Sequence, residues 1–122
     1  MIDIVNYDKN NIFAKILEGQ IPSKKIFENE YVFAFEDINP QAPIHVLIIP
    51  KIPFCSFADF LKKANQEFIS SFFKSFDDIS SKLNLVDGYR LITNVGKFGG
   101  QEVPHLHFHL LSGKIIGKMV SD

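Results

Sequence analysis

Near its C-terminal end the chain reads His105-Leu-His-Phe-His-Leu-Leu111, so three of its four histidines alternate with apolar residues. In a β-strand, side chains two residues apart point to the same face. The alternation predicts a strand over 105–111, with its apolar side chains in a core and its three imidazoles in a row about 7 Å apart. Folding does not require such a row, and histidine acts as nucleophile, proton donor or acceptor near neutral pH. The row therefore predicts an active site.

The segments on the N-terminal side of this strand predict an α+β fold. Asn11 is the expected N-cap of a short helix over 12–17. Strands are predicted over 24–28, 31–36, 44–49 and 89–95, and a glycine-containing loop over 96–103. Between 58 and 85 apolar residues recur at spacings of three and four, which predicts one long amphipathic helix. The result is a mainly antiparallel sheet of about five strands with a long helix across one face.

Composition limits the class of protein. The 122 residues are 46% hydrophobic with a net charge of −1, which predicts one globular domain over 1–122 and offers no basic surface for nucleic acid. The beginning of the chain lacks the features of a signal peptide, and no apolar run is long enough to span a bilayer. Cys55 is the single cysteine. We therefore expect no disulfide within the chain, no membrane association and a cytoplasmic location.

The chemistry of the histidine row is suggested by the loop that precedes it. Adjacent glycines, Gly99 and Gly100, predict backbone N–H groups that point into a shared concavity and bind an anion such as phosphate. An imidazole beside that phosphate can attack it and form a covalent phosphoramidate, while its neighbours stabilise the phosphoryl oxygens. The fourth histidine, His45, is expected to orient the others.

Metal binding is the alternative to phosphoryl or nucleotidyl transfer. Three histidine nitrogens with one open position would suit catalytic zinc. In a straight strand, however, His105 and His109 would lie about 13 Å apart. One ion with bonds of about 2 Å cannot take all three ligands easily. Activity without metal is therefore the expectation, and the chemistry alone leaves the metal alternative open.

The run 105–111 is similar to the motif of the histidine triad superfamily, in which apolar residues separate three histidines. The likeness holds in order and spacing from about residue 11 to residue 113 and is closest to the nucleoside phosphoramidase branch, the histidine triad nucleotide-binding proteins. It is carried by Ile21-Pro-Ser23, Asp37-Ile-Asn-Pro-Gln-Ala-Pro43, His45-Val-Leu-Ile-Ile-Pro-Lys51, Gly88-Tyr-Arg90, Asn94 and Gly99-Gly-Gln101.

This resemblance implies an enzyme without a cofactor. It implies a homodimer that binds purine nucleoside monophosphates and hydrolyses the P–N bond of nucleoside 5′-phosphoramidates such as AMP-lysine through a nucleotidyl-histidine, with aminoacyl adenylates, which are acyl phosphates, as further substrates. His107 matches the nucleophile, and His105 and His109 match its flanking partners, with His109 reaching the α-phosphate. His45 matches the fourth histidine of the family's site.

The resemblance also implies the binding residues. Asp37 matches the carboxylate that binds the ribose hydroxyls, although Asp is also common in turns such as the one before Asn39-Pro40. Ile38 is expected against the base. The apolar walls of the base pocket match Phe13, Ile16 and Ile21, and the phosphate and ribose contacts match Asn94, Gly100, Gln101 and Val103. Glu102 stands where other members carry a serine that handles the leaving amine.

Two alternatives remain at this stage. Dinucleoside polyphosphate hydrolases of the same superfamily continue the histidine strand into a Pro-Arg pair, whereas this chain continues with Leu110-Leu-Ser-Gly-Lys114. An AMP-binding protein that regulates a partner is the other alternative. Turnover of a phosphoramidate would separate it from an enzyme.

Overall fold

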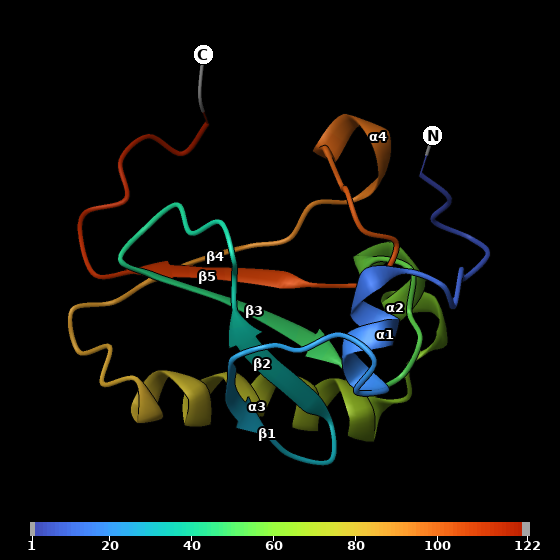
Figure 1. Cartoon of the computed structure of the whole chain (residues 1–122), viewed down its shortest axis with the longest axis horizontal. Helices are drawn as coiled ribbons and strands as arrows, with labels where there is room; N and C mark the ends of the chain where they lie inside the picture. Colours follow the sequence, from blue (N-terminus) through green and yellow to red (C-terminus); the bar gives the residue numbers. More distant parts are fainter. Residues whose placement is uncertain (1, 121–122) are drawn as a thin grey trace.

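The computed structural model describes residues 2–120, and its elements follow one another as in Figure 1. Four helices are present in this part of the chain: α1 (Ile12–Leu17), α2 (Phe57–Lys63), α3 (Gln66–Lys82) and α4 (Gly96–Gly99). Five strands accompany them: β1 (Lys25–Glu28), β2 (Val32–Glu36), β3 (Ile44–Pro50), β4 (Arg90–Ile92) and β5 (Phe108–Ser112). The predicted α+β class is confirmed.

The strands form one antiparallel sheet in the order β1-β2-β3-β5-β4. The central strand β3 pairs with β2 on one side and with β5 on the other. In the β3–β5 register, Leu47 lies opposite His109 and His45 lies opposite Leu111. This register brings a histidine from each strand to the same face of the sheet, on diagonally opposed positions.

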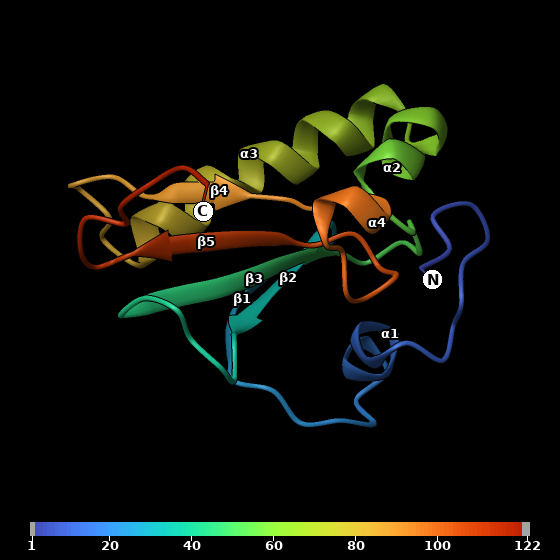
Figure 2. The ribbon, with the colours of Figure 1, turned by 90° about the horizontal axis from the view of Figure 1, so that it is seen from above.

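Helices cover the two faces of the sheet unequally, as Figure 2 shows. Helices α2 and α3 lie along one face, where their phenylalanines pack against Val46, Phe108 and Leu110. Helix α1 lies against the other face, where a smaller cluster joins Phe13 and Ile16 to residues of β2 and β3. Both faces of β3 are therefore buried, in agreement with its nearly continuous apolar sequence.

The expectation of one long helix over 58–85 is wrong in one respect. The helix is broken at Ala64, whose backbone is extended, and Asn65 then begins α3 as an N-cap. The Asn65 side-chain oxygen accepts a hydrogen bond from the backbone N–H of Phe68 at 2.8 Å. Because such a cap satisfies a donor at a helix start, it stabilises the break. The short helix over 12–17, capped by Asn11, is confirmed.

Two further expectations need correction near the histidines. The histidine strand begins at Phe108 and not at His105, so only His109 of the three lies within β5. Continued past Phe108, the β3–β5 register would place Leu106 opposite Pro50, which has no N–H to donate, and the Leu106 N–H binds the Phe54 carbonyl instead. The expected loop over 96–103 begins with the helix α4, and β4 is shorter than predicted.

The helices of residues 2–120 include none that is long and apolar enough to cross a membrane.

Candidate active site

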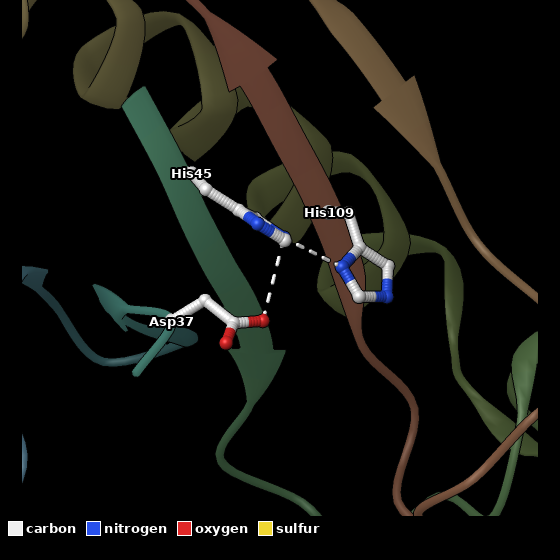
Figure 3. Close-up of side chains that lie close together, drawn as sticks. All are labelled: Asp37, His45 and His109. Carbon is white, nitrogen blue, oxygen red and sulfur yellow. Dashed lines mark hydrogen bonds and ion pairs between the residues drawn. The ribbon is translucent and has the colours of Figure 1, made fainter. Parts of the chain in front are cut away.

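The site lies on one face of the paired strands β3 and β5, beside the loop that follows β2. His45 is the second residue of β3, and His109 is the second residue of β5. Their side chains lie diagonally across the ladder, and His45 Nε2 is 2.9 Å from His109 Nδ1. Asp37, just after β2, points its carboxylate at the same pair, with Oδ2 3.4 Å from His45 Nε2 (Figure 3).

The hydrogen bonds around His45 define which nitrogen carries a proton in each ring. The backbone N–H of Gln41 donates to His45 Nδ1 at 3.0 Å, so a neutral His45 carries its proton on Nε2. That Nε2–H donates to His109 Nδ1. A neutral His109 then carries its own proton on Nε2, so His109 can donate a hydrogen bond from that atom.

His107 has the opposite tautomer. Its Nδ1–H donates to the backbone carbonyl of His105 at 2.8 Å, which leaves Nε2 without a proton. The ring stands edge-on to Phe13, with 5.0 Å between centroids, and 5.2 Å from the ring of His109. A bare nitrogen therefore lies beside a histidine that offers a donor, which is the arrangement needed for nucleophilic attack on a phosphoryl group.

The backbone on both sides of His107 is held in place. The Leu106 N–H donates to the Phe54 carbonyl at 2.8 Å, which fixes the peptide plane that contains the His105 carbonyl. The Thr93 hydroxyl donates to the His107 carbonyl at 2.8 Å. The acceptor for His107 Nδ1–H is thus part of a fixed framework.

His105 does not stand in the expected row of three imidazoles. Its side chain is fully buried at 0% exposure. Its Nε2–H donates to the Pro50 carbonyl at 3.0 Å, and the hydroxyl of Tyr7 lies 2.6 Å from its Nδ1. Both ring nitrogens are therefore occupied within the protein. The imidazoles that face the site are those of His45, His107 and His109. The His105 ring lies in the protein interior instead.

Burial keeps all four imidazoles in their neutral form. Removal from water is the largest cause in each case, because it disfavours the charged form. It lowers the pKa of His105 and of His109 to about 4 and lowers the pKa of His107 and of His45 below 6.5. The carboxylates of Asp37 and Glu102 act in the opposite direction on the pKa of His107. A neutral His107 at pH 7 is a competent nucleophile.

Three residues predicted to line the base pocket, Phe13, Ile16 and Ile21, belong to one apolar cluster that also contains Leu47 and Val103. Ile38, expected against the base, is 88% exposed. Asp37 takes part in the turn considered for it, since its Oδ1 accepts the Asn39 N–H at 2.8 Å, and its Oδ2 faces the histidines.

The expected anion-binding loop is wrong at two positions. The N–H groups of Gly100 and Gln101 donate to the carbonyls of Lys97 and Gly96 and close the end of α4, so they are not free for phosphate. Gly100 adopts a φ of 76°, a conformation that glycine allows without strain. The Gln101 side chain accepts from the Gly96 N–H and donates to the carbonyls of Cys55 and Val103. Gln101 therefore organises the loop.

Two other predicted residues flank α4 in the sequence. Glu102 is exposed and Asn94 is half-buried. Sequence reasoning missed Tyr7 and Thr93. Tyr7 is 98 residues from His105, and Thr93 is 14 residues from His107. Neither contact has a local spacing that would have revealed it.

Within residues 2–120, the side chains that could hold a metal ion are Asp37, His45 and His109, whose ligand atoms lie within 4.8 Å of one another. This group differs from the row of three considered from the sequence. A metal on His45 Nε2 would require the proton to move to Nδ1, where it would face the Gln41 N–H at 3.0 Å. Because two donors would then oppose each other, the geometry favours the hydrogen-bonded chain over a metal site.

The sequence model of the HIT domain family matches residues 18–115 of this chain. A 13.2 kDa HIT-like protein of Azospirillum brasilense is 43% identical over 116 residues, which are 94% of this chain and 95% of the relative. A HIT family hydrolase from Clostridium thermocellum superposes with a TM-score of 0.80 at 40% identity, covering 93% of this chain and 99% of the other. A histidine triad nucleotide-binding protein from Candida albicans superposes with a TM-score of 0.73 at 33% identity, covering 83% and 73%.

The matched region contains all three histidines of the motif, His45, and β1 to β5. The chain belongs to the HIT family.

Proposed function

We propose that the chain is a purine nucleotide-binding hydrolase that cleaves the P–N bond of nucleoside 5′-phosphoramidates through a covalent nucleotidyl-His107 intermediate. The observation that carries the proposal is the hydrogen bond from His107 Nδ1–H to the His105 carbonyl. It leaves Nε2 bare and fixes the ring, while burial keeps it neutral. The hydrolase and nucleotide-binding relatives support the same class.

The reaction divides into two displacements at phosphorus. In the first, the lone pair of His107 Nε2 forms a bond to the α-phosphorus, and the P–N bond to the amine breaks. The amine keeps that electron pair and takes up one proton. In the second, water attacks phosphorus, the P–Nε2 bond breaks, and the pair returns to Nε2. The proton released by water replaces the one taken by the amine, so one water is consumed for each nucleoside monophosphate and amine.

The neighbouring histidines stabilise these steps. The Nε2–H of His109, set by the donor from His45, is the hydrogen-bond donor for the phosphoryl oxygens where charge develops. His105 acts as a positioning residue, since its carbonyl holds His107 and both its ring nitrogens are engaged. This assignment replaces the contact with phosphoryl oxygens that was expected for His105 from its place in the row of imidazoles.

The nucleoside is proposed to bind between α1 and the loop after β2. Asp37 would accept hydrogen bonds from the ribose hydroxyls through the oxygen that faces the site, and Ile38 would cover the base. The apolar cluster that contains Phe13 and Ile16 would form the opposite wall. Asn94, Val103 and Glu102 would lie near the phosphate, ribose and leaving amine.

A steady-state comparison tests the choice between the branches of the superfamily. Adenosine 5′-phosphoramidates, lysine-linked AMP and diadenosine polyphosphates are assayed at equal concentration with purified protein. We expect the phosphoramidates to have the higher kcat/KM. A preference for the polyphosphates of more than about tenfold would overturn the phosphoramidase assignment. AMP binding without turnover of any of them would favour the regulatory alternative.

We further propose that the protein is a cytoplasmic homodimer. Strand β4 lies at the edge of the sheet, with Leu91 exposed by 40%. An uncovered edge of this kind is available for pairing with a second copy. Light scattering at micromolar concentration should show about twice the chain mass of 13.9 kDa, and a monomer would contradict the proposal.

A further inference from the structure

The segment before α1 contacts the first histidine of the motif, His105, through Tyr7. Tyr7 lies in this segment and is half-buried. Its ring packs edge-on against His105 with 5.5 Å between centroids. Tyr7 therefore links the segment before α1 to the first histidine of the motif.

The direction of the Tyr7–His105 hydrogen bond follows from the other partner of the histidine. His105 Nε2 must carry a proton, because it lies 3.0 Å from the Pro50 carbonyl, which can only accept. A neutral His105 then has a lone pair on Nδ1. The Tyr7 hydroxyl at 2.6 Å must donate to it. Tyr7 is thus the donor that completes the hydrogen bonds of a fully buried imidazole.

We propose that Tyr7 is a positioning residue for the nucleophile, acting through His105 on the tautomer of His107. The inference rests on the proposed function for its kinetic consequence. His105 receives the Tyr7 hydroxyl on its ring, while its backbone carbonyl accepts the His107 Nδ1–H at 2.8 Å. One residue therefore joins the hydroxyl to the atom that keeps His107 Nε2 bare.

Removal of the hydroxyl leaves a buried nitrogen without a donor, and this is costly in a dry interior. The His105 ring is then more stable if it rotates until Nδ1 meets another hydrogen-bond donor. This rotation breaks the hydrogen bond to the Pro50 carbonyl and shifts the peptide that carries the His105 carbonyl. A weaker acceptor at that carbonyl allows the His107 proton to move to Nε2. A His107 ring with its proton on Nε2 cannot attack phosphorus.

The first test compares two substitutions that each remove one tyrosine hydroxyl. Tyr7→Phe is expected to lower kcat for an adenosine 5′-phosphoramidate by roughly ten- to a hundredfold, as for a displaced catalytic group, with KM changed less than about twofold. Tyr31→Phe is the matched control, because the Tyr31 hydroxyl binds Glu67 on the helix side of the sheet. The control should keep the wild-type kcat.

The second test reads the tautomers directly and does not depend on turnover. In ¹⁵N spectra of the histidine rings of the wild-type protein, we expect His105 to be protonated on Nε2 and His107 on Nδ1. In Tyr7→Phe, the His105 Nδ1 resonance should move toward the position of a ring nitrogen that accepts no hydrogen bond. The spectrum should also show a second population of His107 with its proton on Nε2.

The outcomes separate this inference from the proposed function. A wild-type kcat in Tyr7→Phe, or an unchanged His107 tautomer, overturns the positioning role. So does a wild-type spectrum with His105 protonated on Nδ1, a result that needs no variant to fold. If the wild-type protein shows the expected tautomers but hydrolyses no phosphoramidate, the proposed function fails while the structural part of the inference stands.

Discussion

Acidification should destabilise the fold through His105 more than through any exposed group. Burial lowers its pKa from 6.5 to about 4. Between these two values the unfolded chain binds a proton at this residue and the folded chain does not, so the free energy of unfolding decreases as the pH falls. The stability is fully present above pH 6.5 and is lost progressively toward pH 4. From the two pKa values, the loss between pH 7 and pH 5 is about 2 kcal/mol for this residue.

Urea unfolding at pH 7, 6 and 5 measures this loss when the protein concentration is held constant. His105→Asn is the matched variant, because the Asn oxygen still accepts from Tyr7 and the side chain does not titrate. The other histidines and the carboxylates titrate in both proteins and cancel in the comparison. We expect the wild type to lose about 2 kcal/mol more than His105→Asn between pH 7 and pH 5. Equal losses would refute the reasoning that His105 is held neutral by burial.

The remaining predictions concern ligand binding and metal. Asp37→Asn keeps an oxygen for the Asn39 N–H and should weaken binding of ribonucleotides by roughly 1.5–3 kcal/mol, mainly in KM. Calorimetry with AMP and 2′-deoxy-AMP checks this, and an unchanged preference for the ribonucleotide would exclude Asp37 as the ribose ligand. Glu102→Gln should reduce kcat/KM for substrates with a positively charged amine group by about two- to fivefold, since Glu102 is exposed. Substrates with neutral amines should be unaffected, and an equal loss for both kinds would contradict a charge effect. Dialysis against a strong chelator should leave turnover intact, because the Gln41 N–H opposes metal at His45. A loss of activity that zinc restores would contradict this expectation.

The elements with strong local patterns were predictable from the sequence. The Asn11 cap, the alternation of Leu106, Phe108 and Leu110 into the core, and the buried strand β3 all appear as expected. Asn65 also carries a cap signal. It was missed because the apolar spacing continues across it, although the chain is extended at Ala64.

The site was predictable in its residue types and less so in its geometry. Alternation along a strand placed the three histidines on one surface, but Pro50 prevents the ladder from reaching His105. The bonds that set the tautomers come from Gln41, from the His105 carbonyl and from Tyr7. Backbone donors and acceptors and contacts between distant residues leave no pattern in the sequence. Gln101 and Gly100 were assigned to phosphate for the same reason, since their bonds within the loop are visible only in three dimensions.

The covalent intermediate on His107 is the central claim, and intact-mass spectrometry of rapidly quenched reactions tests it most directly. With an adenosine 5′-phosphoramidate in excess, the wild-type protein should show a population heavier by one adenylyl group, and tandem fragmentation should place that group on His107. His107→Ala should show no adduct and no turnover while it still binds AMP. Adduct on another residue, or turnover by His107→Ala within about tenfold of the wild type, would contradict the account.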